Sequence, residues 1–187
     1  MLADRVPEVS ENTGEIDELP VFWRSAPADG TPALYLHGVP TNSDDWLPFL
    51  ALGGGLAPDL PGFGRSGKPG NFDFTIEGYA DFLEAYLDLV GVERVRLVVH
   101  DWGVVGLAFA QRHPERVERL VVVNAVPLLP GYEWHRAAQI WRRRWLLVDI
   151  NNFRLAGIPI TYRRVPVFLL SDALALLNIC LRDACCR

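Results

Sequence analysis

The residue best suited to take part in a reaction is Asp101, which ends an apolar run in the sequence VVHDWG (98–103). A carboxylate directly after a buried strand needs a reason, because an unpaired charge is costly to bury. Gly103 and Gly106 follow it, and such small residues let a strand and a helix approach closely. The pattern predicts a sharp turn that exposes one nucleophilic side chain, although Val99 stands where the usual motif has a glycine. The alternative is that Asp101 only caps the following helix, since Asp is a favoured N-cap residue.

Apolar runs and helical patterns alternate around Asp101, and they predict the elements that would position it. Runs such as ALYLH (33–37) and RLVVVNA (119–125) are short, apolar and bounded by turn residues, which is typical of buried strands. Strands that alternate with helices indicate a parallel sheet covered by helices on both faces. We therefore expect strands at 20–25, 33–37, 94–100 and 119–125, a short strand from residue 55, and helices from Thr75 to Val90 and from Gly103 to Gln111.

The segment after Thr75 has the clearest helical pattern in the chain. Thr75 is a suitable N-cap, Glu77 suits the first turn, and Gly91 suits the position just beyond the helix. Apolar residues recur in this segment at intervals of three and four, so they would line one face of the helix. That face would contain Ile76, Tyr79, Phe82, Leu83, Tyr86, Leu87 and Val90.

The predicted fold class is therefore α/β, with a mostly parallel sheet and helices on both faces. Residues 1–18 are predicted to be a flexible N-terminal segment, and residues 19–127 the α/β core. Residues 128–187 differ in character and form a separate part. In open parallel sheets, ligands bind beyond the carboxyl ends of the strands. Two of the expected strands end on His-Gly or His-Asp, so functional residues are expected there.

Four short motifs occur in the order and with the spacing of a known superfamily. They are His37-Gly38-Val39-Pro40, Pro58-Asp59-Leu60-Pro61-Gly62-Phe63-Gly64-Arg65-Ser66, His100-Asp101-Trp102-Gly103 and Arg112-His113-Pro114-Glu115-Arg116-Val117. Together they resemble the α/β-hydrolase superfamily, in particular its haloalkane dehalogenase and epoxide hydrolase branch, from about residue 20 to about residue 141. The resemblance implies an incomplete α/β-hydrolase core over 19–127, followed by a partial helical cap and a divergent tail over 128–187.

The resemblance also implies roles for individual residues. Asp101 would be the nucleophile, and the backbone N–H groups of Val39 and Trp102 would form the oxyanion hole. In dehalogenases, the indole N–H of the tryptophan after the nucleophile also holds the departing halide, which would be a second role of Trp102. An ionised carboxylate needs no base to attack a carbon that bears a halide or an epoxide oxygen, and it forms an alkyl-enzyme ester. The motif residues that support this assignment are His37, Gly38, Pro40, His100 and Gly103.

Hydrolysis of such an ester needs a general base, normally a histidine oriented by an acid. In this fold the chain order is nucleophile, acid, histidine, and the histidine belongs on a loop after the last strand. None of the four histidines stands at that position. They are His37, His100, His113 and His135. The acid is also unplaced, because the carboxylates that follow the strand at 119–125 lack the context of a strand end. They are Glu133, Asp149, Asp172 and Asp183.

Three functions remain open on these residues. Trp102 favours a haloalkane dehalogenase, because its indole offers a hydrogen bond to the halide. Val39 favours an epoxide hydrolase, because dehalogenases typically have a polar, halide-holding side chain there. An epoxide hydrolase cap should also present two tyrosines to the epoxide oxygen, for which Tyr132 and Tyr162 are available. The third function belongs to another class, a catalytically incomplete remnant that lacks the base histidine and only binds a small ligand or a partner chain.

The length of the chain after the expected core predicts an unfinished fold. Only 43 residues follow Arg144, which is too few for a full cap, two further strands and a histidine loop. We therefore expect a truncated or divergent member of the family. Its sheet would end in an open edge, and apolar cap residues such as Trp134, Ile140 and Trp141 would lack their cover, which predicts self-association.

Composition excludes several other classes of protein. The 187 residues are 50% apolar and 22% charged, with a net charge of −5, as is ordinary for a soluble globular protein. No basic block favours nucleic-acid binding, and no apolar tract is long enough to span a membrane. The cysteines Cys180, Cys185 and Cys186 have no metal-ligand spacing, and the absence of a leader predicts a cytoplasmic protein. The expected partner is a small-molecule substrate, without metal or other cofactor.

Overall fold

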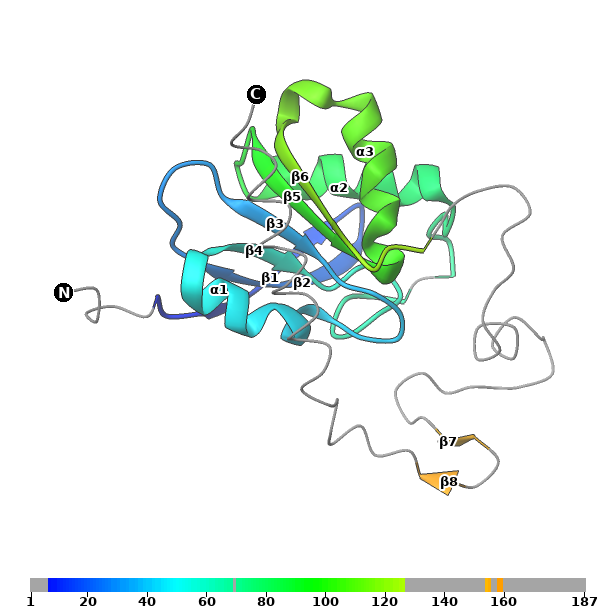
Figure 1. Ribbon diagram of the computed structural model, residues 1–187. Coiled ribbons are helices and arrows are strands. Elements are labelled where there is room, and N and C mark those ends of the chain that lie inside the picture. The colour runs from blue at the N-terminus through cyan, green and yellow to red at the C-terminus, as the bar shows by residue number, and fades with distance from the viewer. Residues whose placement is uncertain (1–6, 69, 127–153, 156–157, 160–187) are drawn as a thin grey trace. The chain divides into compact units, whose positions relative to one another are not determined.

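The computed structural model describes residues 7–68, 70–126, 154–155 and 158–159 (Figure 1). The chain divides into two compact units, residues 1–126 and residues 127–187. In the second unit, the described residues form two short antiparallel strands, β7 (Arg154–Leu155) and β8 (Ile158–Pro159). The predicted partial cap and tail otherwise lie outside the described residues.

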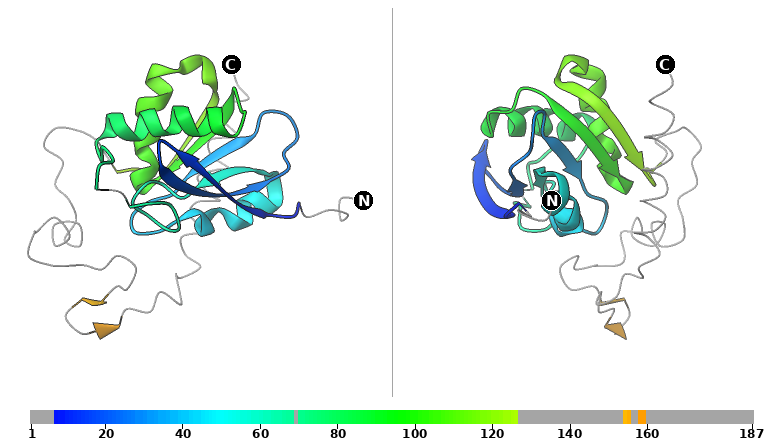
Figure 2. Two further views of the ribbon diagram at one scale, coloured as in Figure 1. Left: turned by 180° about the vertical axis from the view of Figure 1, so that it is seen from behind. Right: turned by 60° about the vertical axis from the view of Figure 1, so that its left-hand side comes forward.

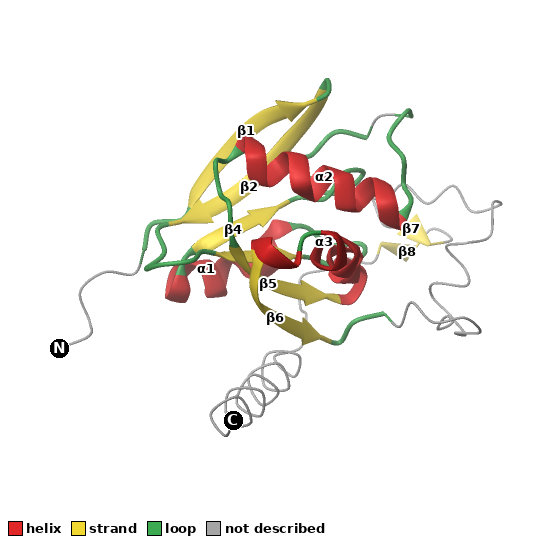
Figure 3. Cartoon of the chain, turned by 90° about the horizontal axis from the view of Figure 1, so that it is seen from above, coloured by secondary structure: helices red, strands yellow, loops and turns green. Residues whose placement is uncertain are grey.

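A six-stranded sheet with the order β1-β2-β4-β3-β5-β6 forms the centre of the first unit (Figure 3). Its strands are β1 (Ser10–Ile16), β2 (Leu19–Ala26), β3 (Ala33–Leu36), β4 (Gly55–Pro58), β5 (Val95–His100) and β6 (Val117–Val123). The four strands β4, β3, β5 and β6 run parallel to one another, whereas β1 and β2 are antiparallel to their neighbours. This arrangement confirms the predicted mostly parallel α/β sheet.

Helices cover both faces of this sheet, as Figure 2 shows. They are α1 (Leu47–Gly53), α2 (Ile76–Leu89) and α3 (Gly106–Arg112), with short 3₁₀ helices η1 (Ser43–Trp46), η2 (Asp101–Val105) and η3 (Pro114–Arg116). Leu34, Leu36 and Leu97 pack with α2 and α3, whereas Ala33 and Tyr35 pack with α1 on the opposite face. Among the described residues, no helix is long and apolar enough to cross a membrane.

Helix α2 forms as its sequence predicts. The Thr75 hydroxyl accepts a hydrogen bond from the Gly78 N–H at 3.1 Å, which satisfies one of the free N–H groups of the first turn. Gly91 follows the helix with φ +69°, a left-handed conformation that favours glycine. The buried face of the helix contains the predicted residues Tyr79, Phe82, Leu83, Tyr86 and Leu87.

The N-terminal segment differs from the prediction of a flexible lead-in over residues 1–18. Strand β1 pairs with β2 along its whole length, and a two-residue turn joins them. The turn residues Asp17 and Glu18 have φ +48° and φ +66°, which matches the hairpin turn type whose two central residues both have positive φ. The sequence SENTGEI has no strong alternation of apolar residues. Its pairing depends on backbone hydrogen bonds to β2, which composition does not reveal.

Two elements near Asp101 also differ in detail. The predicted helix over 103–111 begins earlier, as the 3₁₀ turn η2 at Asp101, and continues as α3. Strand β6 was predicted to be buried on both faces, but Leu120 and Val122 are 43% and 49% exposed. The reason is that β6 is the last strand of the described sheet, and α3 does not reach over these side chains.

Candidate active site

Asp101 lies in a sharp turn between β5 and η2, and its backbone has φ +50°. This left-handed conformation is uncommon for a residue other than glycine, and it is a mark of functional turns. Glycines on both sides make room for the turn. A Cβ on Gly38 would lie 2.5 Å from Cβ of Asp101, and a Cβ on Gly103 would lie 2.4 Å from the carbonyl oxygen of Leu36. These two sites therefore exclude any larger residue in this backbone conformation.

The carboxylate of Asp101 is oriented by the turn that follows β3. The backbone N–H of Val39 donates a hydrogen bond to Oδ1 of Asp101 at 2.9 Å. Within the described part of the chain, Oδ2 accepts no hydrogen bond, which distinguishes it from Oδ1. The chain after β6 approaches the same turn, since the Val126 N–H donates to the carbonyl oxygen of Asp101 at 3.2 Å. Val39 is one of the two predicted oxyanion donors, and its N–H points at the carboxylate of Asp101.

His37 is buried, and its ring makes hydrogen bonds that stabilise the turn that carries Val39. Its Nδ1 lies 2.8 Å from the carbonyl oxygen of Gly38, and its Nε2 accepts a hydrogen bond from the Leu60 N–H at 2.9 Å. A carbonyl oxygen only accepts and an N–H only donates, so the ring is the neutral tautomer with the proton on Nδ1. Burial lowers the pKa of His37, which keeps it neutral. Both ring nitrogens of His37 therefore make structural hydrogen bonds, and the ring is not available as a base.

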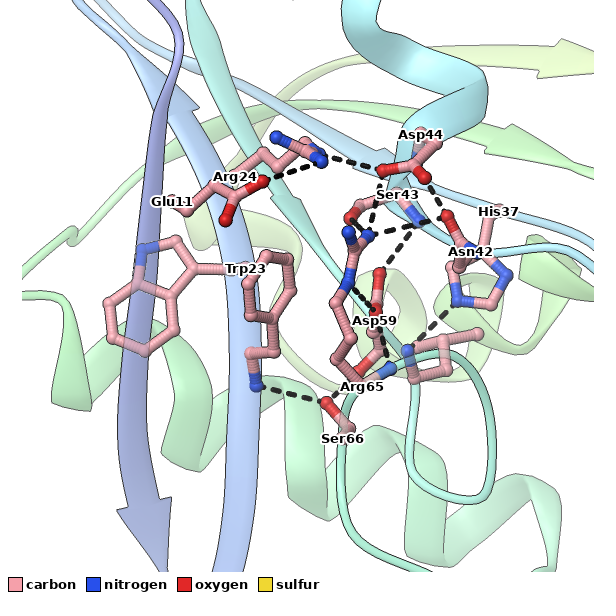
Figure 4. A network of polar contacts seen from close by, with 12 residues as sticks. Glu11, Trp23, Arg24, His37, Asn42, Ser43, Asp44, Asp59, Arg65 and Ser66 are labelled. Carbon is pink, nitrogen blue, oxygen red and sulfur yellow. Dashed lines mark hydrogen bonds and ion pairs between the residues drawn. The ribbon is translucent and has the colours of Figure 1, made fainter. Parts of the chain in front are cut away.

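A network of charged side chains lies beside this turn (Figure 4). Asp59 is fully buried, and its carboxylate accepts hydrogen bonds from the backbone N–H of Ser43 at 2.7 Å and from the backbone N–H of Arg65 at 2.7 Å. The guanidinium of Arg65 contacts both Asp59 at 3.1 Å and Asp44 at 2.7 Å. Asp44 also pairs with Arg24 at 2.8 Å. Burial alone would raise the pKa of Asp44, but the two arginines outweigh it and lower the pKa.

Trp102 follows the nucleophile and packs against the core beside α2. The hydroxyl of Tyr79 donates to the carbonyl oxygen of Pro61 at 3.0 Å and is also hydrogen-bonded to the side chain of Trp102. Burial raises the pKa of Tyr79 to about 12, and the contact with Trp102 opposes this shift. The predicted role of Trp102 in holding a halide remains a prediction, and Tyr79 is a neighbour of Trp102 that the sequence did not single out.

The histidines of the described residues do not form a base for Asp101. His100 packs at right angles against Trp46, with ring centroids 6.4 Å apart. His113 stacks on Phe109 at the far end of α3, and its Nε2 lies 3.4 Å from Glu84. Several residues considered in the sequence lie outside the described residues. They are Tyr132, Glu133, Trp134, His135, Ile140, Trp141, Asp149, Tyr162, Asp172, Cys180, Asp183, Cys185 and Cys186.

Asp101, Val39 and Trp102 are predicted from the sequence as site residues, whereas Asp59 and Arg65 are predicted only as members of a motif, without a role of their own. The signal that could have found them is an Asp directly after a strand and an Arg six residues later, in a loop rich in glycine and proline. A buried carboxylate at that point needs a cation within reach. In the residues that the structure describes, no group of three metal-ligating side chains occurs.

Comparison with known proteins agrees with this geometry. The model of the alpha/beta hydrolase fold family matches residues 31–156. A haloalkane dehalogenase of Mycobacterium marinum is 40% identical over 151 residues, which cover 75% of this chain and 50% of that protein. The chain thus spans about half the length of this relative.

Solved structures are similar as well. A haloalkane dehalogenase from Bradyrhizobium elkani superposes with a TM-score of 0.63 at 28% identity, covering 78% of this chain and 53% of that one. The epoxide hydrolase CorEH superposes with a TM-score of 0.60 at 28% identity, covering 71% of this chain and 49% of that one. The residues matched by the family model include the parallel strands β3, β4, β5 and β6, the turn that carries Val39 and the turn that carries Asp101. The chain therefore belongs to the α/β-hydrolase fold family, and within that family it is similar to haloalkane dehalogenases and to an epoxide hydrolase.

Proposed function

We propose that this chain is a hydrolase of the Asp-nucleophile type that acts on a small apolar electrophile, as a haloalkane dehalogenase does. The observation that carries the proposal is the turn at Asp101. Its φ of +50° and the hydrogen bond from the Val39 N–H at 2.9 Å hold one carboxylate oxygen and leave the other unpaired among the described residues. A helix cap would not need a strained backbone or a donor from another strand end.

The first chemical step would be a displacement at carbon. Oδ2 of Asp101 attacks the carbon that bears the halogen, the carbon–halogen bond breaks, and the halide leaves with the bonding electrons. The products are an alkyl-enzyme ester and a halide ion. Trp102 would donate its indole N–H to the departing halide, and this bond would replace the one that its side chain makes to the Tyr79 hydroxyl. The Val39 N–H keeps the carboxylate in the orientation for attack, which favours a near-attack geometry.

The second step would be hydrolysis of that ester. Water adds to the carboxyl carbon of Asp101, and the negative charge develops on the oxygen that already faces the Val39 N–H. Such a preoriented donor stabilises the tetrahedral intermediate. The step also needs a base to take the proton from water. Among the described residues, no histidine contacts Asp101, so we expect the ester to accumulate.

An epoxide hydrolase is the second candidate, and the side chain of Val39 is the observation that favours it. Val39 is apolar, whereas a dehalogenase typically has a polar, halide-holding residue at this point of the turn. With an epoxide, Oδ2 of Asp101 would attack a ring carbon, the ring carbon–oxygen bond would break, and the alkoxide would take up a proton. The product is a hydroxyalkyl ester, and no anion leaves the site. The similarity to CorEH supports this alternative.

A third candidate is a binding protein without turnover. The observation that favours it is the absence of a base contact to Asp101 within the described part of the chain. Such a protein would retain the site for a small apolar ligand and release it unchanged. It differs from both hydrolases in one respect, since Asp101 would form no covalent bond.

Intact mass spectrometry of the full chain separates these three candidates. The chain is incubated with 1-bromohexane or with styrene oxide, and Asp101→Asn serves as the control because a neutral amide is a poor nucleophile. We expect one stable adduct on the wild-type chain and none on the control. An adduct from the bromide, with bromide released in equal amount, supports the dehalogenase, and an adduct only from the epoxide supports the epoxide hydrolase. An unmodified chain that also releases no bromide and forms no diol contradicts the proposed nucleophile and leaves the binding protein.

A further inference from the structure

The segment that carries the oxyanion donor is held at both ends by two adjacent residues. At one end, the Leu60 N–H donates to Nε2 of His37 at 2.9 Å. At the other end, the carboxylate of Asp59 accepts the Ser43 N–H at 2.7 Å. Between these two anchors lies Val39, whose N–H faces Asp101. The Leu60 N–H and the Asp59 carboxylate therefore fix the position of residues 37–43 from both ends.

Asp59 is itself fixed from several directions. Its N–H donates to the carbonyl oxygen of Phe22 at 2.9 Å, and its carbonyl oxygen accepts from the hydroxyl of Ser66 at 2.6 Å. The Ser66 hydroxyl in turn accepts from the Phe22 N–H at 3.0 Å. Strand β2 thus fixes the backbone of Asp59, and the side chain of Asp59 is hydrogen-bonded to Ser43 and Arg65. The carboxylate is therefore held in one position.

The charge of this buried carboxylate is balanced by Arg65. The guanidinium lies 4.0 Å above the ring of Phe22 and also reaches the hydroxyl of Ser43 at 3.2 Å. It is therefore sandwiched between β2 and η1. A buried carboxylate with a cation and two backbone N–H donors is well satisfied, whereas loss of either partner would leave a group uncompensated.

We propose that Asp59, held by Arg65, is a positioning residue that sets the Val39 N–H against the carboxylate of Asp101. The inference rests on the proposed function only in that Asp101 is taken as the reacting group. An amide at position 59 would offer one acceptor oxygen only, and its NH₂ group would face either the Ser43 N–H or the N–H groups of Arg65, so the turn 37–43 can shift. The Val39 donor then moves away from Oδ1, and the nucleophile gains freedom to rotate. Asp59 acts through Val39, because it does not touch Asp101 itself.

Nuclear magnetic resonance of the full chain labelled with [¹⁵N]valine tests this inference directly. The Val39 amide is identified by the signal that disappears in Val39→Ala. In Asp101→Asn, its proton signal should move upfield, because a neutral amide oxygen is a weaker acceptor than a carboxylate. Asp59→Asn should move the same signal in the same direction. The matched control is Asp81→Asn, which removes an exposed ion pair with Arg112 and should leave the Val39 signal unchanged.

A second readout is the rate of adduct formation at saturating reagent. In Asp59→Asn this rate should fall about tenfold to hundredfold, while the reagent concentration at half-saturation stays the same, because a misplacement of about 1 Å has effects of this size. If Asp59→Asn does not fold, Arg65→Lys replaces it. A lysine keeps the positive charge but lacks the two separate guanidinium nitrogens that donate to Asp59 and to Asp44, so a smaller upfield movement of the Val39 signal is expected.

An unchanged Val39 signal in a folded Asp59→Asn chain would overturn the inference, and so would an unchanged signal in Arg65→Lys if only that variant folds. If the wild-type chain forms no adduct, the proposed nucleophile fails, but the Val39 signal still decides whether Asp59 positions the donor. The two proposals can therefore fail independently.

Discussion

At the scale of single residues, the position of the Asp101 carboxylate against the Val39 N–H depends on the close approach between Gly38 and Asp101. The turn at Asp101 brings its Cβ to where a side chain on Gly38 would start. The contact between Val39 and Asp101 is possible only because residue 38 has no Cβ. A bulkier residue would have to push either the nucleophile or its donor aside.

We expect Gly38→Ala to lower the rate of adduct formation about 10²-fold, because the reacting carboxylate would be displaced by a large part of an ångström. The added methyl group should also cost about 1–3 kcal/mol of stability, as overpacking usually does. Mass spectrometry over time and urea unfolding measure the two effects. Gly70→Ala is the control, since a Cβ on Gly70 would meet no atom within 4 Å. Equal rates in the two variants would contradict this account of the turn.

His37 makes stability depend on pH, because only its neutral ring can accept the Leu60 N–H. Burial lowers the pKa of His37 in the folded chain below the value of about 6.5 of an unfolded chain. The unfolded chain therefore binds the proton more readily. The contribution of His37 is complete above about pH 6.5 and is lost as the pH falls from there towards its folded-state pKa.

Urea unfolding at about pH 7.5 and about pH 5.5, on either side of the ordinary histidine pKa, measures this dependence. We expect the wild-type free energy of unfolding to be lower at the acidic pH and the difference to shrink in His37→Gln. His113→Gln should keep the wild-type difference, because His113 lies at the end of α3 and does not accept the Leu60 N–H, which His37 does. The prediction is wrong if His37→Gln and the wild-type chain lose the same free energy on acidification.

At the scale of elements, α2 supplies the surface on which the active-site turn rests. Tyr79 of this helix contacts Trp102, and Tyr79 and Leu83 belong to the core beneath the sheet. The start of α2 is defined by Thr75, whose hydroxyl caps Gly78. A helix that begins less firmly would loosen the packing below Trp102.

Thr75→Ala should lower the free energy of unfolding by about 1 kcal/mol, the usual effect of losing an N-cap side chain. Thr75→Ser keeps the hydroxyl and should stay close to the wild-type value. Urea unfolding followed by circular dichroism compares the three chains. If the serine variant is destabilised as much as the alanine variant, the hydrogen bond to Gly78 is not the reason for the threonine.

Elements with a strong local pattern could be predicted from the sequence, and those defined by their neighbours could not. The cap and apolar face of α2 are encoded within sixteen residues, so Thr75 and Gly91 indicate its bounds correctly. Strand β1 has a weak pattern and forms because β2 offers a free edge. The residues of the candidate site also fall into a group that local motifs predict and a group that depends on distant contacts. Asp101 and Val39 lie in recognisable turns, whereas the role of Asp59 depends on Ser43, sixteen residues earlier, and on contacts that only the folded chain creates.

At the scale of the molecule, β6 is the feature with the largest consequence. Leu120 and Val122 are in register with Leu97 and Val99 of β5, so both point to the face that carries α2 and α3. They are nevertheless 43% and 49% exposed. Exposed apolar side chains on the last strand of a described sheet are typical of an association site, because a second strand edge can pair there and cover them.

We propose that the chain self-associates through β6 and expect the double variant Leu120→Lys and Val122→Lys to weaken this association. Lysines on an edge strand oppose pairing, since two charged edges repel and would have to be desolvated. Sedimentation velocity over a range of concentrations measures the effect. Leu52→Lys on α1 is the matched control. Leu52 is 84% exposed, more than either β6 residue, but it lies on a helix, which offers no strand edge for pairing. If hydrophobic exposure alone drove association, the control would weaken it at least as much as the β6 variant does. A larger effect of the β6 variant identifies the strand edge as the cause, and a wild-type chain that stays monomeric at every concentration would contradict the proposal.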